Sequence, residues 1–155
     1  MSNNVFRGNY DLNCFEIKFN KYKVSTCYYE KPFICPNGCN AQIITKVVDN
    51  QIEYKIIATG GQVVPACTPC YLESDEAKTY QFWFDETNTD KAPEPNYLWG
   101  TTTSIHVFEK FPQDKYKIYK LTLNNDETKA GWYMFDPSYD MLKPNKAILV
   151  IPLTK

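Results

Sequence analysis

The sequence predicts an all-β protein, a mainly antiparallel β-sandwich or barrel-like module. Three observations predict this class. Apolar and polar residues alternate with a period of two along most of the chain, and β-branched and aromatic residues are abundant. Short turn signals separate the alternating runs, and no stretch keeps apolar residues at helical spacing for three turns. Connections this short favour antiparallel hairpins.

The predicted strands follow one another from the N-terminus. The alternation is clearest in residues 14–19, 51–57 and 116–123, which predict half-buried strands. Shorter runs of the same composition predict the other strands, at residues 22–29, 41–48, 70–73, 79–84, 104–110, 131–135 and 146–151. Turn-forming residues lie between them, at 49–50, 60–61, 124–126 and 136–138.

One domain is expected over residues 1–155, because a chain of 155 residues with 43% apolar residues can bury a single core. The one shift in composition covers residues 85–96, where polar residues are followed by Pro93 and Pro95. Little in this segment can pack. It predicts a long loop or a hinge, at which the domain can be divided into two halves.

Charge and hydropathy argue against two classes of partner. The formal charge is −1, and the basic residues are all lysines except Arg7, whereas base reading and phosphate clamping usually use arginine forks. The longest apolar run, residues 147–151, is far shorter than the roughly 20 residues of a membrane span. Residues 1–8 have no basic start or apolar stretch of a signal peptide. We therefore expect a soluble chain without nucleic-acid or membrane partners.

Four cysteines form the sharpest local pattern. Cys35 and Cys39 are spaced C-x3-C, and Cys67 and Cys70 are spaced C-x2-C after 27 intervening residues. Two turns that each present a cysteine pair can supply the four tetrahedral ligands of zinc. The alternatives are four buried thiols or disulfides. A zinc ion held by four cysteines has no open position, so we expect one structural zinc at most.

The remaining polar residues do not predict an active site. His106, the only histidine, alternates with apolar residues on a predicted strand, and a Cys–His pair is the one nucleophilic arrangement the sequence leaves open. Cys14 and Cys27 lie in predicted strands and are expected as buried thiols. No GxSxG, Walker, GxGxxG or HExxH motif is present. The sequence predicts no enzyme.

Aromatic residues make up 15% of the chain. Alternate aromatics on strands usually fill a core, but their neighbours must point to the opposite face. Exposed aromatics of this kind anchor protein interfaces or stack on sugars. The interface candidates are Trp83, Tyr97, Trp99 and Trp132.

Four segments resemble the β-rich C-terminal modules of Bacteroidetes surface proteins, which accompany leucine-rich repeats or adhesin-like domains. In order along the chain they are residues 63–72, 96–101, 130–135 and 144–152. The resemblance implies an all-β module without a catalytic centre, used for adhesion or assembly. The sequence departs from the family at Cys67 and Cys70, which replace an Asn and an aliphatic residue, and in lacking an export signal.

These observations predict a non-enzymatic structural or assembly protein whose partners are copies of itself or a larger protein assembly. Because virions assemble in the host cytoplasm and need no signal peptide, we expect a virion component of a phage that infects Bacteroidetes, in the capsid decoration, head or tail. The alternative is a carbohydrate- or surface-binding β module. Aromatics lined along one open groove favour that alternative.

Overall fold

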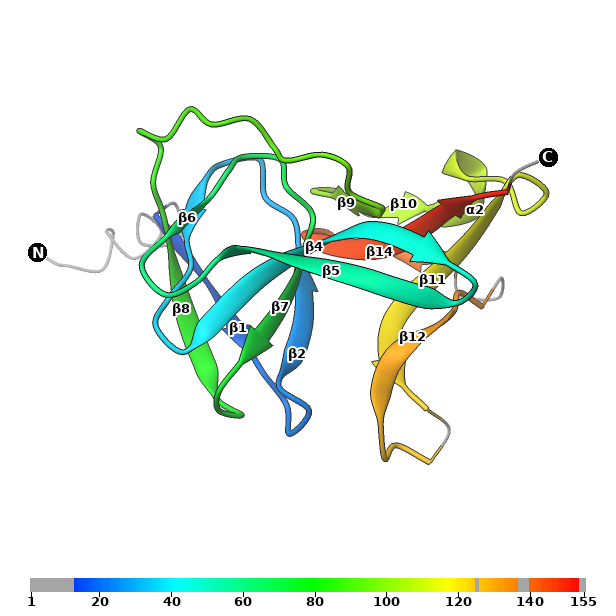
Figure 1. Ribbon diagram of the computed structural model, residues 1–155, viewed down its shortest axis with the longest axis horizontal. Helices are drawn as coiled ribbons and strands as arrows, with labels where there is room; N and C mark the ends of the chain where they lie inside the picture. The colour runs from blue at the N-terminus through cyan, green and yellow to red at the C-terminus, as the bar shows by residue number, and fades with distance from the viewer. Residues whose placement is uncertain (1–12, 125, 137–139, 154–155) are drawn as a thin grey trace, which may run out of the picture.

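A computed structural model describes residues 13–124, 126–136 and 140–153. The predicted all-β class is confirmed, because the described chain folds into four antiparallel sheets (Figure 1). The strands are β1 (Cys14–Lys18), β2 (Val24–Cys27), β3 (Phe33–Ile34), β4 (Cys39–Val48), β5 (Gln51–Ala58), β6 (Val63–Val64), β7 (Cys70–Ser74), β8 (Thr79–Phe84), β9 (Leu98–Thr101), β10 (Ile105–His106), β11 (Tyr116–Leu123), β12 (Ala130–Met134), β13 (Met141–Leu142) and β14 (Lys146–Pro152), and the helix is α2 (Val107–Lys110).

The first half of the chain is a sandwich of two four-stranded sheets, ordered β1-β8-β3-β6 and β2-β7-β4-β5. Their inner faces share one core, in which Phe33 and Phe82 of the first sheet and Leu72 of the second are almost completely buried. Phe15 stacks on Phe82 with ring centroids 4.8 Å apart and meets Phe33 edge-on at 5.2 Å. The alternation seen in the sequence thus sorts aromatic side chains into the space between two sheets.

The second half is a four-stranded sheet, ordered β12-β11-β14-β9, together with the small pair β10 and β13. Its core gathers Val107 of α2, Ile118 of β11 and Ile148 of β14. Residues 85–97, without a strand of their own, connect β8 to β9 along the top of Figure 1. The predicted long loop at residues 85–96 therefore lies between the two groups of sheets.

The two halves pack against each other through a third cluster, where Ile44 of β4 meets Leu98 and Leu149 of β9 and β14. Backbone hydrogen bonds reinforce the contact. The N–H of Tyr97 donates to the carbonyl of Ile44 at 2.8 Å, and the N–H of Tyr28 donates to the carbonyl of Asn145 at 3.1 Å. The hairpin of β4 and β5 crosses from the first half to the second (Figure 1).

Several predicted boundaries were wrong. The strand predicted at residues 104–110 ends at His106. The single turn of α2 follows it and is closed by a hydrogen bond from the N–H of Phe111 to the carbonyl of Val107, whose side chain is buried in the second core. Four short strands, β3, β6, β9 and β13, were not predicted as strands. Two of the turns predicted from the sequence, 124–126 and 136–138, fall partly outside the described residues.

Candidate protein-binding edge

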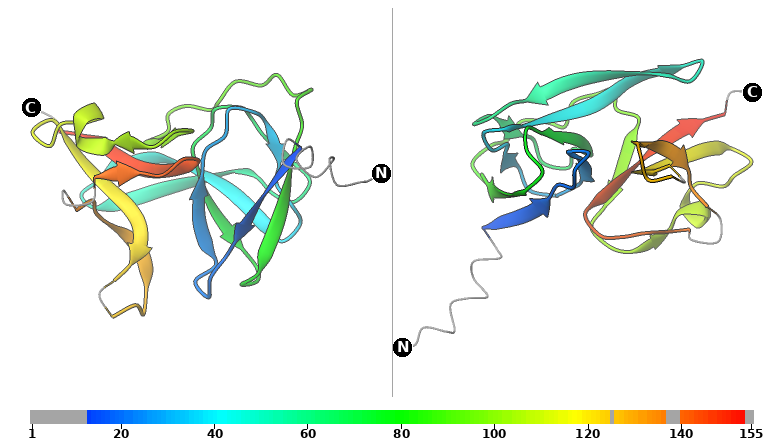
Figure 2. Two further views of the ribbon diagram at one scale, coloured as in Figure 1. Left: turned by 180° about the vertical axis from the view of Figure 1, so that it is seen from behind. Right: turned by 90° about the horizontal axis from the view of Figure 1, so that it is seen from below.

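Strand β5 is the edge of its sheet. The sheet order ends at β5, and no other described strand pairs with its outer side. Viewed from below, β5 is the outermost strand of the hairpin (Figure 2, right). The two-residue turn that leads into it is made by Asp49 and Asn50, both with positive φ (51° and 66°), as expected of a type I′ hairpin turn. An eight-residue strand is thereby held in extended form with one side open.

The backbone direction of β5 follows from Ile44, which stands opposite Tyr54 on β4. The N–H of Ile44 donates to Oδ1 of Asn96 at 3.3 Å, and its carbonyl accepts the N–H of Tyr97. Both groups of Ile44 therefore point away from β5. Opposite residues of an antiparallel pair either exchange both bonds or both turn outward, so the N–H and C=O of Tyr54 point to the open side.

The outward backbone groups of β5 recur every second residue. Ile52 and Ile56 share the direction of Tyr54. The side chains of these three residues lie on one face of the strand, whereas Glu53 and Lys55 lie on the other. Ile56 is 54% exposed and Tyr54 is 39% exposed, which is unusual for large apolar side chains in a strand. The open edge therefore offers backbone hydrogen-bonding groups beside exposed apolar side chains.

Tyr54 is also held to the second half of the chain. Its hydroxyl accepts a hydrogen bond from Nε1 of Trp132 on β12 at 2.7 Å, and its ring lies 4.9 Å from that of Tyr71. Burial raises the pKa of the Tyr54 hydroxyl. The tyrosine ring thus leans over its own chain, which leaves the backbone of β5 accessible.

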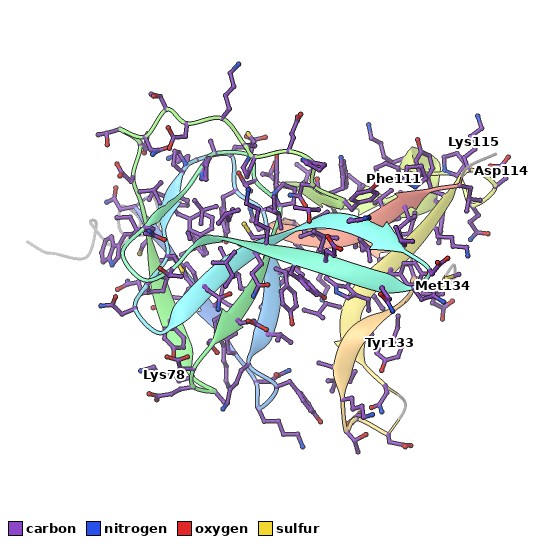
Figure 3. The ribbon with its side chains drawn as sticks, viewed as in Figure 1. Lys78, Phe111, Asp114, Lys115, Tyr133 and Met134 are labelled. Atoms are coloured by element: carbon purple, nitrogen blue, oxygen red, sulfur yellow. The ribbon has the colours of Figure 1, made fainter. Side chains whose placement is uncertain are left out.

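A separate apolar groove of about 390 Å³ lies at the end of β9 and β14. The rings of Tyr97, Trp99 and Phe111 line it together with Pro95 and Pro152. Figure 3 places Phe111 beside α2 and the end of β14. The ammonium group of Lys110 lies 5.9 Å from the centre of the Trp99 ring.

Asn96 is the main polar side chain of this groove, and it is already engaged. Its Nδ2 donates to the carbonyl of Pro69 at 2.9 Å, and its Oδ1 accepts the N–H groups of Leu98 and Ile44. A sugar needs directional hydrogen-bonding partners as well as an aromatic surface. The groove therefore supplies stacking surface with little polar recognition.

The four aromatic interface candidates do not form one surface. Trp83 belongs to β8 and is 50% exposed. Strand β8 lies at one end of the molecule, away from β9 (Figure 1). Tyr97 and Trp99 line the groove. Trp132 packs into the cluster between the two halves and binds Tyr54. Sequence reasoning missed the β5 edge, although the alternation of isoleucine and tyrosine with Glu53 and Lys55 marks both of its faces.

The structure does not bring the four predicted zinc ligands together. Cys35, Cys39 and Cys70 are buried in the first core, whereas Cys67 is exposed. Instead, Cys27 joins the buried thiols and lies directly opposite Cys70 in the pairing of β2 with β7. Among the described residues, no group of three or more His, Cys, Asp or Glu side chains is placed to hold a metal ion. The described residues therefore give no support to the zinc site predicted at these four cysteines, and metal analysis of the purified chain is its test.

The buried thiols are held as neutral groups. All six cysteines lie in the described part of the chain, and none forms a disulfide. Burial raises the pKa of Cys35 to about 12 and that of Cys39 to about 11. Burial, followed by a hydrogen bond with Cys27, also raises the pKa of Cys70. These thiols pack as small apolar side chains and do not have the lowered pKa of a nucleophile.

The only histidine is placed at the surface. Nδ1 of His106 lies 3.3 Å from Oδ1 of Asp140, and the His106 side chain is exposed. Its contact is with a carboxylate, and no hydrogen bond from His106 to a thiol occurs in residues 13–124, 126–136 or 140–153. The structure thus offers no geometry for the Cys–His arrangement left open by the sequence.

Comparisons with known proteins gave no match: no family model, no curated protein and no solved structure is similar to this chain. The resemblance to the Bacteroidetes modules therefore remains a prediction. None of the helical segments described is long and apolar enough to cross a membrane.

Proposed function

We propose that this chain is a non-enzymatic assembly protein that docks to a protein partner by strand addition at β5. The open edge of β5 carries the proposal. Ile52, Tyr54 and Ile56 each direct an N–H and a C=O to the outside, and an added strand would pair with all of them. Natural edge strands that are left unpaired are usually short or shielded, whereas β5 is eight residues long and displays apolar side chains.

The apolar surface beside the edge supports the same function. Tyr54 and Ile56 of β5 are exposed, and their side chains lie on the same face of the strand. A partner strand would cover these side chains while its backbone satisfies the open edge. Burial of apolar area is worth about 25 cal/mol per Å², so covering one isoleucine contributes on the order of 1 kcal/mol to binding.

The virion is the proposed setting of this assembly, and the four-segment resemblance is what supports it. A coat or tail component works through contacts between many protein copies and needs no reaction centre. We expect the chain to sediment with purified phage particles in a fixed ratio to the major coat protein. Its absence from particles, in cells that produce it, would contradict the virion setting and leave β5 docking untouched.

Selection from a peptide-display library tests docking at β5. The full chain is immobilised, and the bound peptides are sequenced. We expect enriched peptides with apolar residues at alternate positions, the pattern of an added strand. Binding to Ile56→Pro should be lost, because proline removes an outward N–H without breaking a bond to β4. The matched variant Ile56→Thr keeps this N–H and should retain most of the binding.

Two results would contradict docking at β5. One is the absence of any enriched peptide on the wild-type chain. The other is equal binding of the enriched peptides to wild type and Ile56→Pro. Trp83→Ser serves as a surface control, because it removes an exposed aromatic side chain from β8, which is not in the sheet of β5.

A glycan-binding module is the second candidate, favoured by the aromatic groove at Tyr97, Trp99 and Phe111. A glycan array tests it with the full chain. Signals that disappear in Trp99→Ala and persist in Ile56→Pro would establish glycan binding. An array without signals above those of Trp99→Ala would exclude it for the glycans tested.

A further inference from the structure

The partner that fits the β5 edge best is the same edge of a second copy. We infer that two copies pair antiparallel through β5, with the two Tyr54 residues facing each other on a twofold axis. This inference rests on the proposed function and names its partner. It follows from three properties of the strand: the direction of its backbone groups, the order of its charges and the closure of its sheet.

The outward backbone groups select the registers that can form. An antiparallel ladder needs outward residues opposite outward residues. With Tyr54 on the axis, Tyr54 meets itself and Ile52 meets Ile56 of the second copy. All three outward positions are then used in each copy. A shift of the pairing by one residue places outward groups opposite inward ones and leaves no ladder.

The charges of Glu53 and Lys55 determine which of the remaining registers is the most stable. With Tyr54 on the axis, Glu53 of each copy stands directly opposite Lys55 of the other. An axis at Glu53 would set two glutamates face to face, and an axis at Lys55 would set two lysines face to face. Directly opposed like charges destabilise a strand pair, whereas opposite charges stabilise it. Neither Glu53 nor Lys55 has an ion-pair partner within the described part of the chain.

The side chains leave room for this pairing. The Tyr54 ring leans toward Tyr71 and Trp132 of its own chain and stays clear of the axis. Ile52 and Ile56 would form two cross-strand apolar pairs on the same face as Tyr54. The exposed side of Ile56 is covered in these pairs, which removes the largest exposed isoleucine surface of the strand.

The pairing also stops at two copies. The opposite edge of the same sheet is β2, and the second half of the chain contacts its C-terminal end. The N–H of Ala147 donates to Oγ1 of Thr26 at 3.2 Å, and Nδ2 of Asn145 donates to the carbonyl of Tyr28 at 2.9 Å. An eight-stranded sheet formed from two copies would therefore end on each side in a β2 strand whose C-terminal end already contacts the second half of its own chain. A twofold contact of this kind closes and does not propagate.

Charge exchange at the two positions tests the register. The full chain is studied by sedimentation equilibrium over roughly 1–500 µM, a range in which a dimer shows its concentration dependence. We expect wild type to dimerise. Lys55→Glu and Glu53→Lys should each weaken dimerisation by about tenfold or more, because each change creates two like-charge pairs. Both residues are exposed, so both variants should fold.

Mixing the two variants gives the decisive result. Lys55→Glu has glutamate at both positions, and Glu53→Lys has lysine at both positions. A dimer of one chain of each variant therefore has two pairs of opposite charges, so the equimolar mixture should dimerise at least as well as wild type. The double variant Glu53→Lys/Lys55→Glu should dimerise with itself for the same reason. A dimer that resists both single changes, or a mixture that stays monomeric, would overturn the proposed register.

The outcomes separate this inference from the proposed function. A monomeric wild-type chain whose edge still binds strand-like peptides in an Ile56-dependent manner would overturn self-pairing and keep strand docking. A monomeric chain that binds no such peptide would overturn both. A peptide with the β5 sequence should compete with the dimer, and the same peptide with its two charges exchanged should compete less.

Discussion

Gly100 lies directly against Tyr28, so that a Cβ added at Gly100 would stand 2.3 Å from the Cβ of Tyr28. Gly100 belongs to β9 in the second half of the chain, and Tyr28 follows β2 in the first. Real Cβ atoms do not approach this closely, and the backbone of one half would have to shift. The absence of a side chain at Gly100 is therefore a condition for the packing of the two halves.

The variant Gly100→Ala is expected to destabilise the protein by about 1–3 kcal/mol, the usual cost of an overpacked site. The free energy of unfolding is measured by urea denaturation. Gly131→Ala in β12 is the matched control, because an added Cβ there has its nearest neighbour at 3.5 Å, an ordinary contact. Equal stability of Gly100→Ala and wild type would contradict the close packing of the halves.

The six thiols should differ sharply in reactivity. Cys67 is exposed and Cys14, which was predicted as a buried thiol, is only half-buried, whereas Cys27, Cys35, Cys39 and Cys70 are buried. With a chromogenic disulfide reagent, we expect Cys67 to react in the native state and the four buried thiols to react only on unfolding. The rapidly labelled cysteine at position 67 should be lost from the fast phase in Cys67→Ser. Rapid native-state labelling of a buried cysteine, located by mass spectrometry, would contradict this arrangement.

Removal of metal should leave the protein unchanged. Because Cys67 lies apart from the three buried cysteines, the folded chain does not present the tetrahedral set that zinc requires. We expect Tm to be the same with and without EDTA, and elemental analysis to find no zinc in the purified chain. About one zinc per chain, together with a lower Tm in EDTA, would instead support the predicted site of Cys35, Cys39, Cys67 and Cys70.

Alkaline pH should destabilise the fold. Burial raises the pKa of Cys35 from 9.0 to about 12 and that of Cys39 to about 11. Well below pH 9 these thiols are protonated in both the folded and the unfolded state and contribute no pH dependence. Above it the unfolded chain loses their protons first, so the folded state binds more protons and the free energy of unfolding falls.

Lys146 acts in the opposite direction. Partial burial lowers the pKa of its ammonium group, so the charged group destabilises the fold at lower pH. This destabilisation is relieved as the pH rises toward the ordinary pKa of lysine, because the folded chain then loses the Lys146 proton first. Urea denaturation between pH 8 and pH 11 measures the balance. In Cys35→Ala, the free energy of unfolding should fall less steeply with pH than in wild type. The difference in slope is at most about 1.4 kcal/mol per pH unit, which corresponds to one proton. An unchanged slope in this variant would contradict the buried, neutral state of Cys35.

The sequence was sufficient for the fold class because alternation reports directly on strands that are buried on one face. Strands β1, β5, β8 and β11 were predicted within one residue at each end for this reason. The two-residue strands β3 and β6 are too short to show alternation, and their pairing partners are distant in sequence. The strand predicted through Val107 failed because apolar content alone does not separate a strand from one helical turn.

The functional surface was harder to predict. The alternation at Ile52, Tyr54 and Ile56 was visible, but whether a strand is central or at an edge depends on long-range pairing. The cysteine spacing predicted two adjacent turns, whereas Cys27 joins the buried group only because β2 pairs with β7. Spacing along the chain could not show that Cys27, and not Cys67, is buried together with Cys35, Cys39 and Cys70.

Amide hydrogen exchange in β5, measured by NMR at two protein concentrations, distinguishes a β5 edge that is paired with a second copy from one that is open. Glu53 and Lys55 direct their N–H groups to β4 and should be protected at both concentrations. Ile52, Tyr54 and Ile56 direct theirs outward and should become protected only at the concentration where the dimer forms. Fast exchange at these three residues at high concentration, with the chain fully folded, would contradict pairing through the β5 edge.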